Sequence, residues 1–438
     1  MNIIISGAGK VGFNLAKTLS IGHNVIVIDK NKDALLRLQE SLDILPFFGD
    51  IQNPATFKEF EDMQIDLYIA VTNLDEANII SCMVVDDVLK PRRKFLRLKN
   101  DFYEDTSLKE RLSIEELIFP LKLSSKSILN FLEYPKINNI KDFKYTDFKL
   151  VSVFSKDTYE YVKIEELLDS QNELLVAIER DKSLLINTKT DIKAGDLLYF
   201  FAKKESIKKI CEIFDGSSTD IKNCVVFGAN DLGVEMTKLL IEKKKSVKLI
   251  EKDVELCHKA DELLSGEADI INSKYQDEKL FIEENLDKAD LFISTYKDDE
   301  YNIIKCLEAK EFDIKKIVAV NNDGEFYHLM HRLGIVTVRG PKMSAYNTIV
   351  EAINNSKVIV EKYFCGGKGI LFLRKIFENS KLIGTRIKDP NLEKAKFFII
   401  REGKIQFLLD TTLQEGDVLV AISDMEISSK VKLWIYEL

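Results

Sequence analysis

The sequence has no apolar stretch long enough to span a membrane, no closely spaced cysteines and no excess of basic residues. Its longest uncharged apolar segments, such as Leu197 to Ala202, are the length of a strand, whereas a membrane span needs about 18 apolar residues. The 6 cysteines form no CxxC pair, which disfavours a disulfide framework or a zinc site and is typical of reduced cytosolic thiols. The 63 basic and 72 acidic residues give a formal net charge of −9, which disfavours nucleic-acid binding. The chain opens directly into an apolar strand without a basic leader, so we expect a cytoplasmic protein.

A tandem repeat accounts for most of the length of the chain. The segment Gly7-Ala8-Gly9-Lys10-Val11-Gly12 recurs as Gly228-Ala229-Asn230-Asp231-Leu232-Gly233, and the turn at Gly195-Asp196 recurs at Gly416-Asp417. Both recurrences have an offset of 221 residues, close to half of the 438-residue length. We therefore predict a duplication in which each half contains a larger and a smaller domain.

The larger part of each half alternates short apolar runs with helical patterns, which predicts a doubly wound parallel sheet. In the first half the expected strands are Asn2–Ser6, Asn24–Ile28, Ile44–Phe48, Leu67–Val71, Lys94–Leu98 and Leu117–Phe119. A helix is expected over Lys10–Leu19, because Val11, Leu15, Ala16 and Leu19 form one apolar stripe.

The smaller part of each half is rich in β-branched and aromatic runs separated by turns, which predicts a small α+β domain. The segment from Asp215 to Asp220 contains Gly, Ser and Thr and is the clearest linker in the chain. The expected domains are two nucleotide-binding domains at 1–135 and 221–354, each followed by a small α+β domain, at 136–215 and 355–438.

The glycine-rich segment of the first half follows an expected strand and opens an expected helix, the context in which Gly-x-Gly-x-x-Gly binds a nucleotide. Gly7 permits the tight turn, Gly9 allows the backbone to approach a pyrophosphate, and Gly12 allows close helix–strand packing. The helix N-terminus adds free N–H groups and a partial positive charge. Asp29 ends the second strand, where a carboxylate binds ribose hydroxyls and repels a 2′-phosphate. The pattern favours NAD(H) or an adenine mononucleotide over NADP.

Further polar residues follow later strands of the same expected sheet. Asp50, Thr72, Asn73 and Arg97 all fall at or near strand ends, and ligands of open parallel sheets bind outside the carboxyl ends of the strands. We expect Arg97 to meet a phosphate, and Thr72 and Asn73 to reach a ribose or the second half of a dinucleotide.

The second copy departs from this pattern. Asn230 replaces the middle glycine, Asp231 replaces Lys10, Asn272 stands in place of Asp50, and Val320 replaces Arg97, while Glu251 keeps the ribose-type carboxylate. We expect this site to bind more weakly, to favour a less charged ligand, or to be empty.

The whole chain resembles the TrkA family, the cytoplasmic nucleotide-binding regulatory subunits of Trk-type potassium uptake systems. The resemblance rests on the glycine loop, Val27-Ile28-Asp29, Gly49-Asp50, Thr72-x-x-Asp75-Glu76-x-Asn78, the twin Gly-Asp turns and their duplicated order. It implies two Rossmann-like RCK-N domains, also called KTN domains, each followed by an RCK-C domain. It also implies a homo-oligomer, expected to be a tetramer, on the inner face of the cell membrane, gating a TrkH/TrkG-like potassium-translocating subunit.

The resemblance also implies NAD(H) as the ligand, with ATP or ADP as alternatives, and it implies a set of contacts. The expected first-copy contacts are Gly7, Ala8, Gly9, Lys10, Val11, Gly12, Asp29, Asp50, Thr72, Asn73 and Arg97. Their second-copy equivalents are Gly228, Ala229, Asn230, Asp231, Leu232 and Glu251.

Two other functions remain open: an NAD-dependent oxidoreductase, and a regulatory subunit of a different ion channel or antiporter. A dehydrogenase needs an acid or base beside the nicotinamide, yet His23 is the only histidine before His258 and precedes the second strand. His328 and His331 lie three residues apart on an expected helix, without a third metal ligand nearby in the sequence. We therefore expect neither catalytic residues nor a metal site.

Overall fold

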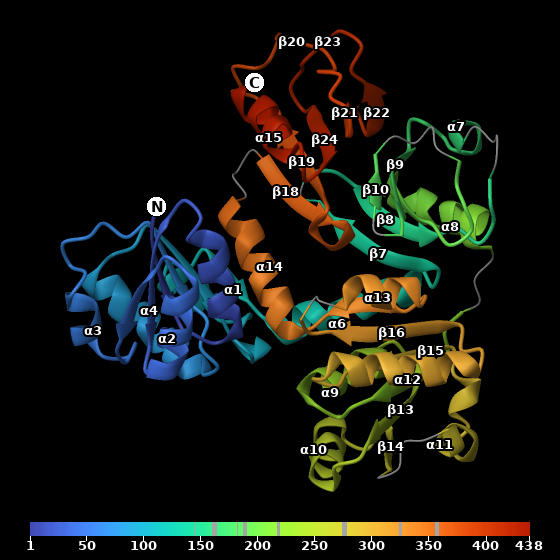
Figure 1. The fold of residues 1–438 in the computed structure, drawn as a ribbon, viewed down its shortest axis with the longest axis horizontal. Helices are drawn as coiled ribbons and strands as arrows, with labels where there is room; N and C mark the ends of the chain where they lie inside the picture. Colours follow the sequence, from blue (N-terminus) through green and yellow to red (C-terminus); the bar gives the residue numbers. More distant parts are fainter. Residues whose placement is uncertain are drawn as a thin grey trace. The chain divides into compact units, whose positions relative to one another are not determined.

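The computed structural model describes residues 1–143, 145–159, 164–181, 183–186, 191–216, 220–273, 278–323, 326–354 and 359–438 (Figure 1). Ser217, Ser218 and Thr219 of the expected linker lie outside these ranges. No helix within these ranges is long and apolar enough to cross a bilayer. The chain forms two compact units, Met1–Lys126 with Arg339–Ala352, and Ser127–Val338 with Ile353–Leu438. This grouping differs from the four expected domains, which follow the sequence order.

The first sheet has six parallel strands in the order β3-β2-β1-β4-β5-β6, the doubly wound order that the sequence predicts. Its strands are β1 (Asn2–Ser6), β2 (Asn24–Asp29), β3 (Leu45–Phe48), β4 (Leu67–Ala70), β5 (Arg93–Arg97) and β6 (Glu116–Ile118). The connecting helices are α1 (Lys10–Leu19), α2 (Lys32–Ser41), α3 (Pro54–Lys58), α4 (Asp75–Val88), η1 (Asp101–Tyr103) and α5 (Leu108–Arg111). Ile3, Ile4 and Ile5 of β1 have no exposed surface, because helices cover both faces of the sheet.

One helix of the second half belongs to the first compact unit. Helix α14 (Pro341–Asn354) contacts α6 (Pro120–Glu133), where the Ser344 and Ser124 hydroxyl oxygens lie 2.8 Å apart. The Tyr346 and Thr18 hydroxyl oxygens lie 2.7 Å apart, and Arg93 Nη2 donates to the Ala352 carbonyl at 2.9 Å. Because of these contacts, α14 is fixed along its length against the first domain.

The second parallel sheet repeats the strand order of the first, β14-β13-β12-β15-β16-β17. Its strands are β12 (Asn223–Phe227), β13 (Ser246–Glu251), β14 (Asp269–Asn272), β15 (Leu291–Ser294), β16 (Lys316–Asn321) and β17 (Val336–Arg339). Its helices are α9 (Asp231–Glu242), α10 (Val254–Leu264), α11 (Glu278–Glu283), η3 (Leu286–Lys288), α12 (Asp299–Glu311) and α13 (Tyr327–Arg332). The duplication and the α/β fold are thus confirmed.

The two smaller domains contain antiparallel sheets in the orders β10-β9-β11-β8-β7 and β18-β19-β24-β21-β22, and the second also has the pair β20-β23. In the first half the elements are β7 (Ile137–Asp142), β8 (Phe148–Phe154), α7 (Ile164–Leu167), β9 (Glu173–Arg180), β10 (Ser183–Leu185), β11 (Leu197–Lys203), η2 (Lys204–Ser206) and α8 (Ile207–Asp215). In the second they are β18 (Ile359–Phe364), η4 (Cys365–Gly367), β19 (Gly369–Lys375), β20 (Arg386–Ile387), β21 (Ala395–Arg401), β22 (Lys404–Phe407), β23 (Thr411–Thr412), β24 (Val418–Asp424) and α15 (Ser428–Glu437).

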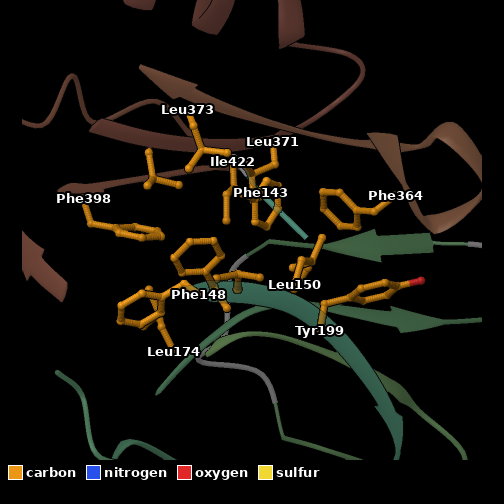
Figure 2. Packing of buried hydrophobic residues seen from close by; sticks show 14 of the residues in the cluster. Phe143, Phe148, Leu150, Leu174, Tyr199, Phe364, Leu371, Leu373, Phe398 and Ile422 are labelled. Carbon is orange, nitrogen blue, oxygen red and sulfur yellow. The ribbon is translucent and has the colours of Figure 1, made fainter. Parts of the chain in front are cut away.

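A single hydrophobic core joins the two smaller domains (Figure 2). Leu150 and Leu371 occupy equivalent positions in the two copies, as do Phe201 and Ile422, and all four are buried in this core. Phe201 stacks on Phe148 with ring centroids 5.2 Å apart and also meets Phe398 of the other domain at 5.4 Å. The same sheet face therefore contributes to the core from each domain.

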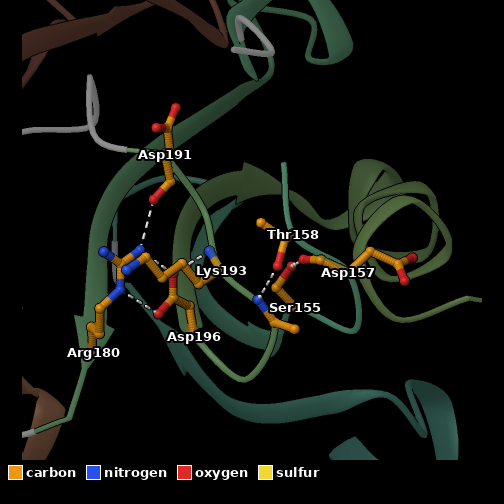
Figure 3. A network of polar contacts seen from close by, with 8 residues as sticks. Ser155, Asp157, Thr158, Arg180, Asp191, Lys193 and Asp196 are labelled. Carbon is orange, nitrogen blue, oxygen red and sulfur yellow. Dashed lines mark hydrogen bonds and ion pairs between the residues drawn. The ribbon is translucent and has the colours of Figure 1, made fainter. Parts of the chain in front are cut away.

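The twin Gly-Asp turns contain the same polar network in both smaller domains, and Figure 3 shows the first of them, around Asp196. Asp196 is buried and accepts two hydrogen bonds from Arg180, at 2.8 and 2.6 Å, and a third from the Lys193 backbone at 2.7 Å. Asp417 accepts the equivalent bonds from Arg401 at 2.9 and 2.7 Å and from the Gln414 backbone at 2.8 Å. Since these carboxylates are fully used within each domain, the turns stabilise the domains internally.

Candidate nucleotide site

A cavity of about 400 Å³ lies at the carboxyl edge of the first sheet, within the first compact unit. Ten of the eleven expected first-copy residues line it: Gly7, Ala8, Gly9, Lys10, Val11, Asp29, Asp50, Thr72, Asn73 and Arg97. Further lining residues are Ile28, Lys30, Asn31, Ala34, Arg37, Gly49, Ile51, Gln52, Val71, Leu74, Ala77 and Lys342. The switch in strand order between β1 and β4 brings these loops together.

Gly12 is the expected residue that does not line the cavity. A Cβ at this position would lie 1.8 Å from the carbonyl oxygen of Gly7, so only glycine allows α1 to pack this closely. A Cβ at Gly233 would meet the Gly228 carbonyl at the same distance. The third glycine of the motif therefore serves packing in both copies, as the sequence predicts for Gly12, and the expected ligand contact of Gly12 stays a prediction.

Gly9 has no such structural requirement. It is the N-cap residue of α1 with φ −70° and ψ −174°, a conformation open to any residue. A Cβ built on Gly9 would meet no protein atom within 4 Å. Among the described residues no side chain caps α1, so its first N–H groups face the cavity without a side-chain partner from that part of the chain. The space beside Gly9 and the free helix N-terminus together form an anion-binding cradle.

Arg97 supplies a buried cation at the same cavity. It is 7% exposed, and its Nη1 makes only long contacts of 3.3 to 3.4 Å with Val71 O, Thr72 O and Asn73 Oδ1. Its buried Nε has no hydrogen-bond partner in the described part of the chain. Burial lowers the pKa of the guanidinium, while Asp75 acts in the opposite direction. A buried guanidinium with unused donors is suited to a phosphate.

The charges that line the cavity favour an anionic ligand. Five cationic side chains line it: Lys10, Lys30, Arg37, Arg97 and Lys342. The two lining carboxylates already accept backbone hydrogen bonds. Asp29 accepts from Ala8 N at 2.6 Å and Asn31 N at 2.8 Å, and Asp50 accepts from Gln52 N at 2.9 Å. A chain with a net charge of −9 thus has a positively charged cavity.

The motif residues Asp75 and Asn78 position the loops of the site from outside it. Asp75 accepts hydrogen bonds from the backbone N–H groups of Lys99 and Asn100, which follow β5. Asn78 accepts from Thr72 N and Thr72 Oγ1 and donates to the Arg97 carbonyl at 2.8 Å. The side chains of α4 therefore connect the loop after β4 to the loop after β5.

The second copy closes its own cradle. The Asn230 side chain accepts hydrogen bonds from Leu232 N at 3.0 Å and Gly233 N at 3.1 Å and donates to the Thr295 carbonyl at 2.6 Å. These are the helix N–H groups that a phosphate needs. The sequence predicts a weaker or empty site here, and the structure adds that Asn230 occupies the anion position as an N-cap.

The remaining second-copy residues are also engaged within the protein. Glu251 is 2% exposed and accepts hydrogen bonds from Ala229 N, Lys252 N and Asp253 N. Asp231 pairs with Lys259 at 3.2 Å. Asn302 donates a hydrogen bond to the Val320 carbonyl. In the first copy, Asn78 donates the equivalent hydrogen bond to the Arg97 carbonyl, so Val320 stands at the Arg97 position. Thus, at the described positions equivalent to Arg97 and Gly9, this copy has an apolar side chain and a capped helix end.

Sequence reasoning missed three of the five cations at the cavity. Lys30 and Arg37 follow β2 and lie on α2, where no motif marks them. Lys342 comes from the second half of the chain, far from the glycine loop in sequence. Only the packing of α14 on the first domain brings it there.

Solved structures share the fold. The GsuK channel bound to NAD superposes with a TM-score of 0.63 at 15% identity, covering all of this chain and 79% of the other. The GsuK RCK domain gives a TM-score of 0.61 at 16% identity, covering all of this chain and 95% of that one. At this identity the likeness establishes the fold alone.

Related sequences extend over nearly the whole chain. The Trk system potassium uptake protein TrkA homolog of Archaeoglobus fulgidus is 26% identical over 443 residues, covering 99% of both proteins. The Trk system potassium uptake protein TrkA of Vibrio alginolyticus is 26% identical over 436 residues, covering 95% of this chain and 94% of its own. The TrkA-N domain model matches residues 3–120 and 224–341, which together exceed half of the sequence. The chain therefore belongs to the TrkA-N domain family.

Proposed function

We propose that this protein is a non-enzymatic regulatory subunit that binds NAD(H) or an adenine nucleotide and controls potassium uptake through a membrane partner. The relatives over nearly the full length are named as potassium uptake proteins. Solved structures of the same fold are named as a channel bound to NAD and as GsuK bound to ADP, the latter with a TM-score of 0.51, 13% identity, and coverage of 81% of this chain and 69% of that one.

The single observation that carries the nucleotide proposal is the open cradle at Gly9 beside the buried Arg97. Neither backbone geometry nor packing requires glycine at position 9, so a bound group explains its missing side chain. Asp29 adds a carboxylate where the adenosine ribose binds in this fold, which favours NAD(H), ATP or ADP over NADP.

One nucleotide per chain is part of the proposal. Asn230 already occupies the helix N-terminus of the second copy, and Val320 cannot supply the charge of Arg97. The expected second set of contacts, Gly228 to Leu232 and Glu251, thus forms a site that is closed or much weaker than the first.

The proposal extends to assembly. We place the protein on the inner face of the cell membrane as a homo-oligomer, a tetramer by family resemblance, docked on a TrkH/TrkG-like potassium-translocating subunit. A nucleotide changes such an assembly only through its different affinity for two ring shapes.

The test is a calorimetric titration of the full chain with NADH, NAD, ATP, ADP and NADPH, with NADH absorbance followed in parallel. We expect saturable binding near one site per chain, weakest for NADPH, and no loss of NADH absorbance when metabolites are added. Consumption of NADH would contradict the regulatory proposal and would favour an NAD-dependent oxidoreductase. Potassium flux into vesicles carrying a Trk-type channel subunit, with and without this protein and nucleotide, then tests the partner.

A further inference from the structure

The cavity at the first glycine loop includes one cation from the other half of the chain. Lys342 is the second residue of α14, which begins at Pro341 and follows β17 of the second parallel sheet. It lines the cavity together with Gly9, Lys10 and Arg97. Within the described ranges, its exposed ammonium makes no hydrogen bond or ion pair.

The position of Lys342 is fixed by contacts farther along α14. Ser344, two residues on, is buried against Ser124 of α6, and Tyr346, about one turn on, meets Thr18 of α1. Ala352 near the other end accepts a hydrogen bond from Arg93, which starts β5. Since β5 runs from Arg93 to Arg97, α14 extends from the cavity at the carboxyl edge of the sheet to the opposite edge. A helix anchored in this way holds its first turn at the cavity.

Three of the positive groups at the cavity come from different parts of the chain. The N–H groups of α1 and the Arg97 guanidinium are parts of the first sheet and its helix. Lys342 belongs to the connection that leads from the second parallel sheet into β18, the first strand of the last domain. A phosphate held between these groups would therefore contact both halves of the chain. A lysine ammonium is a mobile point charge and suits this contact with a phosphate.

We propose that Lys342 binds a phosphate of the nucleotide in this cavity and is the residue through which the second half of the chain senses it. The inference rests on the proposed function. It adds to that function the residue that detects whether a nucleotide is bound in the cavity. The ligand class is a nucleotide with a diphosphate or a longer phosphate chain. The bound phosphate adds a contact between the first turn of α14 and α1, so the ligand stabilises the packing of α14 against the first domain.

Calorimetry with ADP and NADH on full-length variants tests the contact. Lys342→Gln should weaken both ligands about tenfold, the usual scale for losing one charge-assisted contact, while Lys342→Arg should keep most of the affinity. Lys58→Gln is the matched control, because Lys58 is an exposed lysine of the same domain that does not line the cavity. Equal melting temperatures of the unliganded variants exclude a folding defect.

Hydrogen exchange in α14 tests the sensing. Saturating ADP should slow amide exchange across residues 344–354 in the unmodified protein and in Lys58→Gln, and should leave it unchanged in Lys342→Gln at saturating ligand. Unaltered affinity in Lys342→Gln would overturn the contact, and undiminished protection of α14 would overturn its sensing role. Absence of ADP and NADH binding in the unmodified protein would instead refute the proposed function itself.

Discussion

Gly9 and Asn230 stand at the same point of the two copies with the same backbone conformation, φ −70° with ψ −174° and φ −70° with ψ 172°. Gly9 leaves the end of its helix open, whereas the Asn230 side chain fills the equivalent end with its own oxygen. One residue therefore separates a helix end that can bind an external anion from one that is capped internally.

The two glycines of the first loop should respond differently to alanine. Gly9→Ala should change the free energy of unfolding by about 1 kcal/mol or less, because its Cβ meets no protein atom, and should weaken nucleotide binding at least tenfold. Gly12→Ala should destabilise the domain by about 3 kcal/mol or more, because its Cβ would strike the Gly7 carbonyl. Thermal melting and calorimetry on both variants check this, and similar stability losses would contradict it.

Opening the second cradle should create a second site. In the double variant Asn230→Gly, Asp231→Lys, the N–H groups of Leu232 and Gly233 lose their cap. We expect the calorimetric stoichiometry to rise from one toward two nucleotides per chain, the second weaker because Val320 provides no cation. Asp231→Lys alone is the control. Unchanged stoichiometry and affinity in the double variant would show that Asn230 does not block the site.

Removal of the two ribose-type carboxylates, Asp29 and Glu251, should have different effects on nucleotide affinity and on stability. Asp29→Ala should weaken nucleotide binding at least tenfold, because Asp29 lines the open cavity. Glu251→Ala should affect binding far less. It should instead lower stability, by about 2 kcal/mol, because Glu251 is buried and satisfies three backbone N–H groups. Equal binding losses in parallel titrations would mean that both copies bind alike.

Removal of the buried Arg97 guanidinium should weaken nucleotide binding without lowering the stability of the unliganded protein. Arg97→Met removes a desolvated charge with an unpartnered Nε, so the unliganded protein should be as stable as the parent or more stable. Nucleotide affinity should fall at least tenfold. Arg92→Met, an exposed arginine before the other end of β5, is the control. A large loss of unliganded stability in Arg97→Met would assign Arg97 a structural role instead.

A buried histidine should make stability fall in acid. His331 of α13 is buried beside Asn138, Tyr327 and Glu179, and burial lowers its pKa to about 4 against the opposing effect of Glu179. Between about pH 6.5 and pH 4 the unfolded chain therefore binds a proton that the folded chain does not. This should cost about 2 kcal/mol at pH 5 relative to pH 8.

Denaturant midpoints measured at pH 5 and pH 8 test the assignment. His331→Gln should flatten the difference between the two midpoints, and His258→Gln, which alters an exposed histidine, should preserve it. An unchanged pH dependence in His331→Gln would assign the acid sensitivity to another group.

Local patterns in the sequence were sufficient for the fold and for most of the first cavity. Helix α1 has the bounds that its apolar stripe predicts, Lys10–Leu19, and Asp29, Thr72 and Arg97 meet because parallel strands end at one edge. These features follow from hydrophobic periodicity and from polar residues at strand ends. Both signals are local, because the residues that make up each one lie close together in the sequence.

The features that were missed depend on contacts between distant segments. Lys342 reaches the cavity because α14 packs on the first domain, and nothing near Lys342 in the sequence marks this. The N-cap of Asn230 depends on a side-chain orientation, for which the sequence offers only the residue type.

The common core of the two smaller domains makes them an internal dimer whose partners are covalently tethered. The shared core contains two pairs of equivalent residues, Leu150 with Leu371 and Phe201 with Ile422. Equivalent residues of two separate chains meet in the same way at a two-fold interface. Tethering makes their association independent of protein concentration, so it persists at dilutions that would dissociate separate subunits. Because this pairing does not involve the second glycine loop, the second copy can hold the two smaller domains together without a nucleotide cradle of its own.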